Sequence, residues 1–192
     1  MTRLLPLLLA LAGCASPDRG SEFDPAQQQA ALQRMRFAVE AVCLNNRSRD
    51  DQDRVARSLG FPIRERQDGG INYVNPSTLT FLRLAPAGPQ TVALPGGGTR
   101  DYSGQGCSVG SPAVNVDMAN RLVGEILAPR LVEGDSSVAL PVAAGVNEAR
   151  GAGLFFDDLA ITVPLGTTTI TNDGGEGVRF VHPVILIVHG GR

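Results

Sequence analysis

The stretch Val184-Ile185-Leu186-Ile187-Val188, directly after Pro183, is apolar at every position. Successive side chains of a strand point to opposite faces of the sheet, so an unbroken apolar run is typical of a strand buried on both faces. Pro183 has no backbone N–H and therefore confines the start of the strand to a bulge or a sheet edge. The stretch predicts a central strand over about residues 178–188.

Glycine and proline account for 23 and 13 of the 192 residues, a composition typical of strands joined by turns. Further strands are predicted at about residues 71–74, 78–84, 91–94, 102–109, 137–142, 154–163 and 167–171. The gaps between the first four are short, which predicts antiparallel neighbours. Asn172-Asp173-Gly174-Gly175 is the strongest hairpin signal in the chain.

Three helices are predicted from their capping residues. Asp24-Pro25-Ala26-Gln27 combines an N-cap aspartate, a proline at the first helical position and a glutamine that completes a capping box, and this helix extends to about Leu44. A second helix begins at Ser48 and closes at Gly60. Asn115 caps a third, which Pro129 should end.

This order of elements predicts an α+β fold. We expect a mostly antiparallel sheet with the N-terminal helical hairpin and the one further helix packed on one face of it.

The N-terminus has a different character from the rest of the chain. One arginine, Arg3, precedes the apolar residues 4–12, a run much shorter than the about 20 residues that a membrane span requires, and typical of the apolar region of a secretory signal. Leu11-Ala12-Gly13-Cys14 resembles the lipobox of bacterial lipoproteins. The resemblance implies cleavage before Cys14, a diacylglycerol on its thiol and a further acyl chain, such as palmitate, on its new amine.

On this resemblance, residues 1–13 are a signal peptide, residues 14–23 are the lipidated N-terminus and tether, and residues 24–192 form a single domain. Ala15 resembles the residue that follows the cysteine in lipoproteins bound for the outer membrane. We therefore expect the domain in the cell envelope, anchored to the periplasmic face of the outer membrane.

Composition excludes several kinds of chemistry and partner. All 17 basic residues are arginine, so no lysine can form a Schiff base, serve a Walker-type phosphate loop or act as a general base. The chain has no basic run, an aromatic content of 5% and no tryptophan, which argues against nucleic acid as a partner. No cofactor is indicated.

Two cysteines remain beside the lipobox. Cys43 lies on the apolar face of the first predicted helix, with Met35, Val39 and Val42, and Cys107 lies near the end of a predicted strand. A pair of cysteines in an exported protein predicts a disulfide, here one that joins the helix to the sheet.

Gly106-Cys107-Ser108-Val109-Gly110 matches the G-x-S-x-G pattern and resembles the nucleophile elbow of α/β hydrolases. Asp157 or Asp158, and then His182 or His189, follow in the order used by that family, so the resemblance implies Ser108 as nucleophile with these residues as partners.

Two features oppose the hydrolase interpretation. Residues 110–112, Gly-Ser-Pro, stand where the helix of an elbow should begin. The hydrolase sheet is parallel with repeated helices, whereas this chain has one helix between its strands. We therefore interpret Ser108 as an ordinary strand residue.

The remaining titratable groups give no metal or acid–base pair. His182 and His189 are seven residues apart, so on one uninterrupted strand they face opposite sides of the sheet; we place His182 at a strand start and His189 in a terminal loop. Asp157 and Asp158 are adjacent and their side chains should diverge, as in a solvated turn.

The sequence thus favours a lipid-anchored, non-enzymatic binding or structural module whose partner is an unidentified envelope protein or cell-wall component. One alternative is a lipid-anchored serine hydrolase. Another is an inhibitor or immunity-type module that presents an exposed loop such as residues 85–98.

Overall fold

The computed structural model describes residues 23–93, 97–132, 143–147, 151–171 and 177–191. The signal peptide, Cys14 with its tether up to residue 22, the predicted strand at 137–142 and the hairpin turn at 172–175 lie outside the described residues. Within the described ranges, no helix is both long and apolar enough to cross a membrane.

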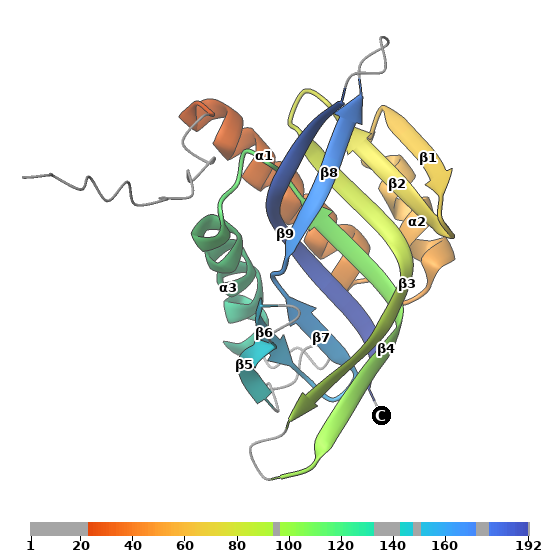
Figure 1. Ribbon diagram of the computed structural model, residues 1–192, viewed down its shortest axis with the longest axis vertical. Coiled ribbons are helices and arrows are strands. Elements are labelled where there is room, and N and C mark those ends of the chain that lie inside the picture. Colours follow the sequence, from red (N-terminus) through yellow and green to blue (C-terminus); the bar gives the residue numbers. More distant parts are fainter. Residues whose placement is uncertain (1–22, 94–96, 133–142, 148–150, 172–176, 192) are drawn as a thin grey trace, which may run out of the picture.

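The chain folds into helices on one side of a large antiparallel sheet, which confirms the α+β prediction (Figure 1). The helices are α1 (Pro25–Phe37), the π-helix η2 (Ala38–Leu44), α2 (Arg49–Ser58) and α3 (Val116–Val132). The strands are β1 (Ile63–Gln67), β2 (Gly70–Asn75), β3 (Thr80–Ala93), β4 (Thr99–Gly110), β5 (Ala143–Asn147), β6 (Gly151–Phe155), β7 (Leu159–Thr162), β8 (Leu165–Thr171) and β9 (Gly177–Gly191). Their order is β1-β2-β3-β4-β9-β7-β6-β5, and β8 pairs with β9.

The helix starts follow their capping residues. The Asp24 side chain accepts a hydrogen bond from the Gln27 backbone N–H (2.9 Å), and the Gln27 side chain accepts one from the Asp24 N–H (3.2 Å). Helix α1 continues directly into η2, so the helix reaches Leu44 as predicted. Gly60, just beyond α2, has a φ of 68°, the conformation expected of a glycine that ends a helix.

Pro129 does not end α3 as predicted, because the helix runs to Val132. A proline this close to the C-terminus removes one backbone hydrogen bond from the last turns and leaves the earlier turns intact.

Two strand predictions are wrong in the first half of the sheet. The predicted break around residues 85–90 is absent, and β3 continues through it with a bulge between Ala87 and Gln90. Pairing of β3 with β2 ends at Leu84, so Pro86 and Pro89 lie on a free edge, where a missing N–H costs no ladder bond. Strand β1 was not predicted, because its Ile-Arg-Glu-Arg-Gln sequence shows no apolar alternation and all five residues are exposed.

The predicted strand at 154–163 is in fact two antiparallel strands, β6 and β7. Asp157 and Asp158 form the turn between them, as the sequence suggested, and pair with Arg100 and Arg47 respectively. The short β5, which pairs with β6, was also not predicted.

The main core lies between the helices and one face of the sheet, which we call the helix face. Its most buried side chains include Met35, Val39 and Val42 from the helices and Leu82, Leu84, Val109, Ile185 and Ile187 from the strands. The predicted disulfide joins Cys43 of η2 to Cys107 of β4, with 5.4 Å between their Cα atoms, and both residues are fully buried. It covalently links the helical layer to the sheet.

Strand β9 belongs to two ladders. Residues 184–191 pair with β4 and, in part, with β7, whereas residues 177–183 pair with β8. We call β8 with residues 177–183 of β9 the arm. Pro183 lies at the junction, one residue before pairing with β4 begins, so its missing N–H leaves no β4 partner unpaired. Pro183 therefore has no partner on β4, which agrees with the predicted edge position, but it lies within β9 and not at the start of the strand as predicted.

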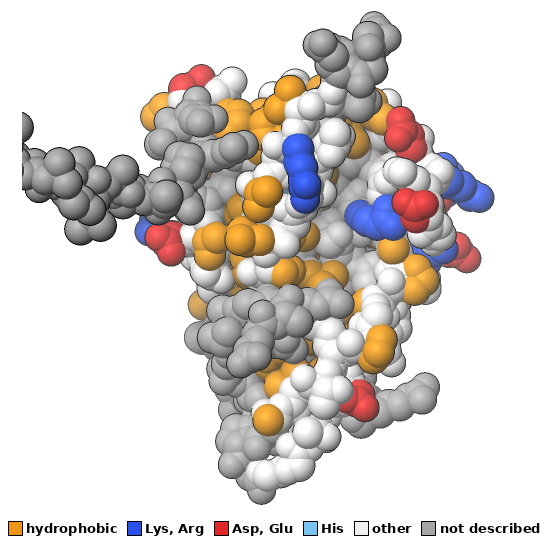
Figure 2. Space-filling model, in the orientation of Figure 1, with side chains coloured by type: hydrophobic (Ala, Val, Ile, Leu, Met, Phe, Trp, Pro, Cys, Tyr) orange, Lys and Arg blue, Asp and Glu red, His pale blue; other side chains and the backbone are white. Residues whose placement is uncertain are grey.

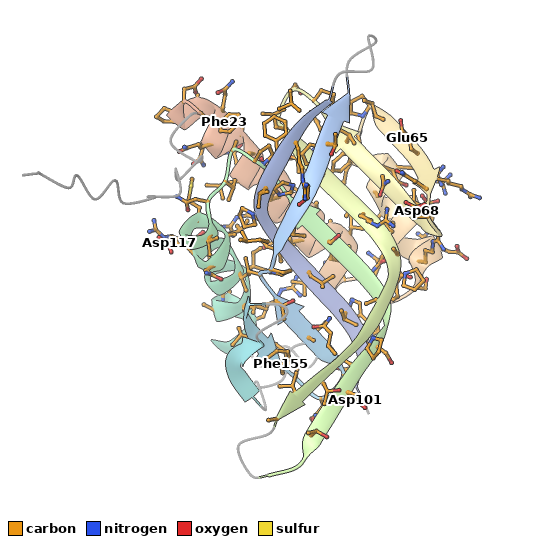
Figure 3. The ribbon with its side chains drawn as sticks, viewed as in Figure 1. Phe23, Glu65, Asp68, Asp101, Asp117 and Phe155 are labelled. Atoms are coloured by element: carbon orange, nitrogen blue, oxygen red, sulfur yellow. A yellow bond between two sulfur atoms is a disulfide. The ribbon has the colours of Figure 1, made fainter. Side chains whose placement is uncertain are left out.

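The arm lies across the face of the sheet opposite the helices, which we call the outer face (Figure 1). At the other end of this face, a second small cluster buries Tyr102, Phe155, Ala160 and Val188, and the Tyr102 hydroxyl donates to the Phe156 carbonyl (2.6 Å). Figure 3 labels Phe155 at this end of the molecule. Among the described residues, the arm and this cluster lie at opposite ends of the outer face.

Candidate functional site

A groove of about 720 Å³ lies between the arm and the outer face of β1–β4. Its floor comes from outward-pointing residues of these strands, and its wall from four consecutive residues of β8, Gly166 to Thr169. Figure 2 views this side of the molecule, where acidic and basic side chains gather over the β1–β2 edge.

The strand register arranges the floor in two rows that run across the strands. One row is apolar and contains Ile63, Val74, Phe81, Gly110 and Val184. The next row contains the polar residues Glu65, Asn72, Arg83 and Ser108 and ends at the apolar Leu186 of β9. The arm packs on the apolar row, which leaves the polar row accessible beside it.

His182 fixes the arm to the apolar row. Its ring stacks on Phe81, with 5.8 Å between the centroids, and lies over Gly110, where an added Cβ would be 2.7 Å from the His182 ring. Only glycine at position 110 therefore allows the arm to approach this closely.

The hydrogen bonds of His182 define its tautomer. Nδ1 lies 3.0 Å from the Pro183 carbonyl and must donate to it, so Nε2 accepts from the Thr168 hydroxyl at 2.9 Å. Burial lowers the pKa of His182, against the opposing effect of the Pro183 carbonyl, so the neutral form is favoured near pH 7.

His189 lies on the other face of the sheet, as the odd spacing from His182 predicted. Its Nε2 donates to the Cys43 carbonyl at 2.6 Å, and burial lowers its pKa. The predicted terminal loop is wrong, because β9 extends to Gly191 and includes His189; His182 likewise lies inside β9 and not at its start. Within the described part of the chain, no three His, Cys, Asp or Glu residues are grouped as metal ligands.

Ser108 and His182 line the same groove, but their hydrogen bonds go elsewhere. Ser108 lies within β4, and its hydroxyl donates to the Arg83 carbonyl at 3.5 Å. Both ring nitrogens of His182 are occupied by Thr168 and Pro183. The motif order thus brings a serine and a histidine to one groove without joining them by a hydrogen bond.

Arg83 is the main charged group on the floor, and it belongs to none of the sequence motifs described above. Arg83 is half-buried as a residue, and its guanidinium donates to the Asn72 side-chain oxygen (2.8 Å) and to the Asp68 carbonyl (3.5 Å) and lies over Gly70. Among the described residues, no carboxylate lies within ion-pair distance of Arg83. The groove therefore contains a fixed cation able to accept an anionic ligand group.

Arg64 differs from Arg83 because a carboxylate neutralises its charge. On the helix face, Arg64 of β1 donates to both carboxylate oxygens of Asp53 (3.0 and 3.1 Å) and to the Tyr73 hydroxyl (3.1 Å). Burial alone would raise the pKa of Asp53, but the hydrogen bonds from Tyr73 and Arg64 lower it overall. This group attaches α2 to the sheet, whereas the partners of Arg83 among the described residues are all neutral.

Comparison of the chain with protein-family models, with curated proteins and with solved structures found no match in any of the three, so a function for the groove has to be inferred from its own residues.

Proposed function

We propose that this protein is a lipid-anchored, non-enzymatic binding module of the bacterial envelope and that the groove beside the arm holds its ligand. The observation that carries the proposal is the half-buried Arg83, held by Asn72 and without a carboxylate partner in the described part of the chain. A guanidinium without a carboxylate partner can form charge-assisted hydrogen bonds with a bound anionic group.

Site-specific photocrosslinking tests this proposal with a control on the same strand. Benzoylphenylalanine would replace Glu65, which lines the groove, or Arg66, the next residue, whose side chain points to the helix face. Both positions are exposed, so neither change should unfold the domain. In irradiated intact cells we expect an adduct from position 65 only, and Arg83→Gln should reduce it. Equal adducts from both positions would contradict a ligand in the groove.

Lipid anchoring makes a separate prediction about Cys14. Cys14→Ala removes the thiol that would carry the diacylglycerol, so labelling with radioactive palmitate should disappear and the domain should move from the membrane to the soluble periplasmic fraction. The acyl chains contribute about 0.8 kcal/mol per buried methylene, so the change should be nearly complete. Unchanged labelling in this variant would contradict the lipobox resemblance.

The serine hydrolase remains a second candidate, because Ser108 and His182 share the groove. A nucleophilic serine needs a base within hydrogen-bond reach, and the Ser108 hydroxyl instead donates to a backbone carbonyl. We expect a fluorophosphonate probe to leave the purified protein unlabelled. Stoichiometric labelling that is lost in Ser108→Ala would favour the hydrolase over the binding module.

A further inference from the structure

We propose that the ligand of the groove is an extended peptide segment that pairs with the free edge of β8 and places a carboxylate against Arg83. This inference rests on the proposed function of the groove. It follows from the direction of the β8 backbone, the shape of the groove and the charges on its floor.

One edge of β8 is unpaired within the described residues. The strand pairs with β9 from Leu165↔Pro183 to Thr171↔Gly177 and with no other described strand. An unpaired edge presents a row of backbone N–H and C=O groups to which another extended chain can bind. Binding of a peptide as an added strand uses these groups.

The pairing of β8 with β9 shows which backbone N–H and C=O groups of β8 are left for a further strand. The Val184 N–H donates to the Pro164 carbonyl at 2.9 Å, which makes this facing pair a hydrogen-bonded one. Such pairs alternate along an antiparallel ladder, so Gly166 and Thr168 direct their backbone groups to β9. The N–H and C=O groups of Thr167 and Thr169 consequently point away from β9.

This free edge borders the groove. Residues of one face of a strand occur at every second position, whereas Gly166, Thr167, Thr168 and Thr169 all line the groove. A cavity that touches consecutive residues lies along the edge of the strand. A peptide bound to the Thr167 and Thr169 backbone would therefore lie inside the groove, above the polar row.

The floor selects the side chains of such a peptide. Alternate side chains would point down toward Asn72 and Arg83, and a carboxylate there would form a charge-assisted hydrogen bond with the guanidinium. Glu65, at the β1 end of the same row, is two strands from Arg83, about 10 Å away at ordinary strand spacing. Figure 3 labels Glu65 on β1. Because Glu65 repels an acid at its own end, the peptide carboxylate belongs at Arg83.

Selection from a phage-displayed library of random octapeptides on the purified lipidated protein in detergent tests the inference. Enriched peptides should contain an acidic residue, and their affinity should fall roughly tenfold or more in Arg83→Gln. Thr167→Pro removes the N–H that points to the groove and should weaken binding roughly fivefold to tenfold, whereas Thr167→Val keeps that N–H and should change affinity less than about twofold. Glu65→Gln should bind at least as well as the unchanged protein.

The ligand provides an independent measurement in case Thr167→Pro does not fold. In a peptide bound as a strand, every second backbone N–H points to β8. N-methylation of these residues of an enriched peptide should abolish binding, whereas N-methylation of the residues between them should not. Enrichment of no peptide, or peptides that bind Thr167→Pro and N-methylated forms equally well, would overturn the peptide assignment. If position 65 still crosslinks a ligand in that case, the groove remains the binding site and only the peptide is excluded; if it does not, both proposals fail.

Discussion

Reduction of the Cys43–Cys107 disulfide should lower the free energy of unfolding by roughly 4 kcal/mol. The bond closes a loop of 64 residues, and the loss of chain entropy in the unfolded state sets this value as an upper figure. For a chain of this size the melting temperature should fall by roughly 10 °C. The effect is a large share of an ordinary domain stability of about 5–15 kcal/mol.

Thermal unfolding of Cys43→Ser and Cys107→Ser measures this loss without reductant. The two variants should have similar melting temperatures, and the double variant should be little less stable than either, because each change removes the same bond. Mass spectrometry of the denatured, alkylated protein gives the decisive control. Alkylation of both cysteines without reductant would mean that the bond does not form in the cell.

Gly104→Ala should destabilise the protein by about 3 kcal/mol or more, the second largest effect that we expect. Gly104 lies in β4 at the irregularity opposite β9 and has a φ of 148°, a conformation that costs a residue with a side chain roughly 1–3 kcal/mol. An added Cβ would also lie 2.4 Å from the His189 carbonyl oxygen, so the backbone of β9 would have to move. That movement would disturb the hydrogen bond that the His189 ring donates to the backbone carbonyl of Cys43.

Gly124→Ala provides the matched control for this substitution. Gly124 lies on the exposed side of α3, and an added Cβ there would meet no atom within 4 Å. Replacing a helical glycine by alanine should increase stability by roughly 0.5–1 kcal/mol. Urea unfolding of both variants should therefore give midpoints on opposite sides of the unchanged protein. Equal midpoints would mean that β4 and β9 can separate at Gly104 without cost.

The elements whose cause is local could be predicted from the sequence. The capping box at Asp24 and the cap at Ser48 each act over three residues, and both helices begin there. The apolar run at 184–188 likewise predicted the middle of β9, because the signal lies in consecutive residues. The errors occurred where the structure of a segment depends on a partner distant in the sequence. Pro86 and Pro89 stay within β3 because pairing with β2 stops at Leu84. Strand β1 forms because it pairs with the edge of β2.

The candidate site could not be predicted from the sequence, because it also depends on pairing between distant strands. Arg83, Asn72 and Glu65 form one row only through the register of three strands, and no motif connects them along the chain. The motif at Ser108 did point to the right groove, but its spacing says nothing of hydrogen bonds, and the structure gives Ser108 and His182 other partners. The disulfide was predictable because the chain holds only two cysteines outside the lipobox.

The disulfide also determines how the molecule would respond to force. If the protein is tethered at its N-terminus and binds a peptide along β8, as we propose, a pull on that peptide acts between the anchor and β8, which is joined to β4 through β9. Tension that enters through α1 passes at Cys43 directly to Cys107, next to Ser108 on the groove floor. The segment between the cysteines, with α2 and β1 to β3, is bypassed, and its roughly 220 Å of extended length cannot be released while the bond is intact. The strands that hold Arg83 are therefore shielded from tension that would otherwise unravel them from the helical end.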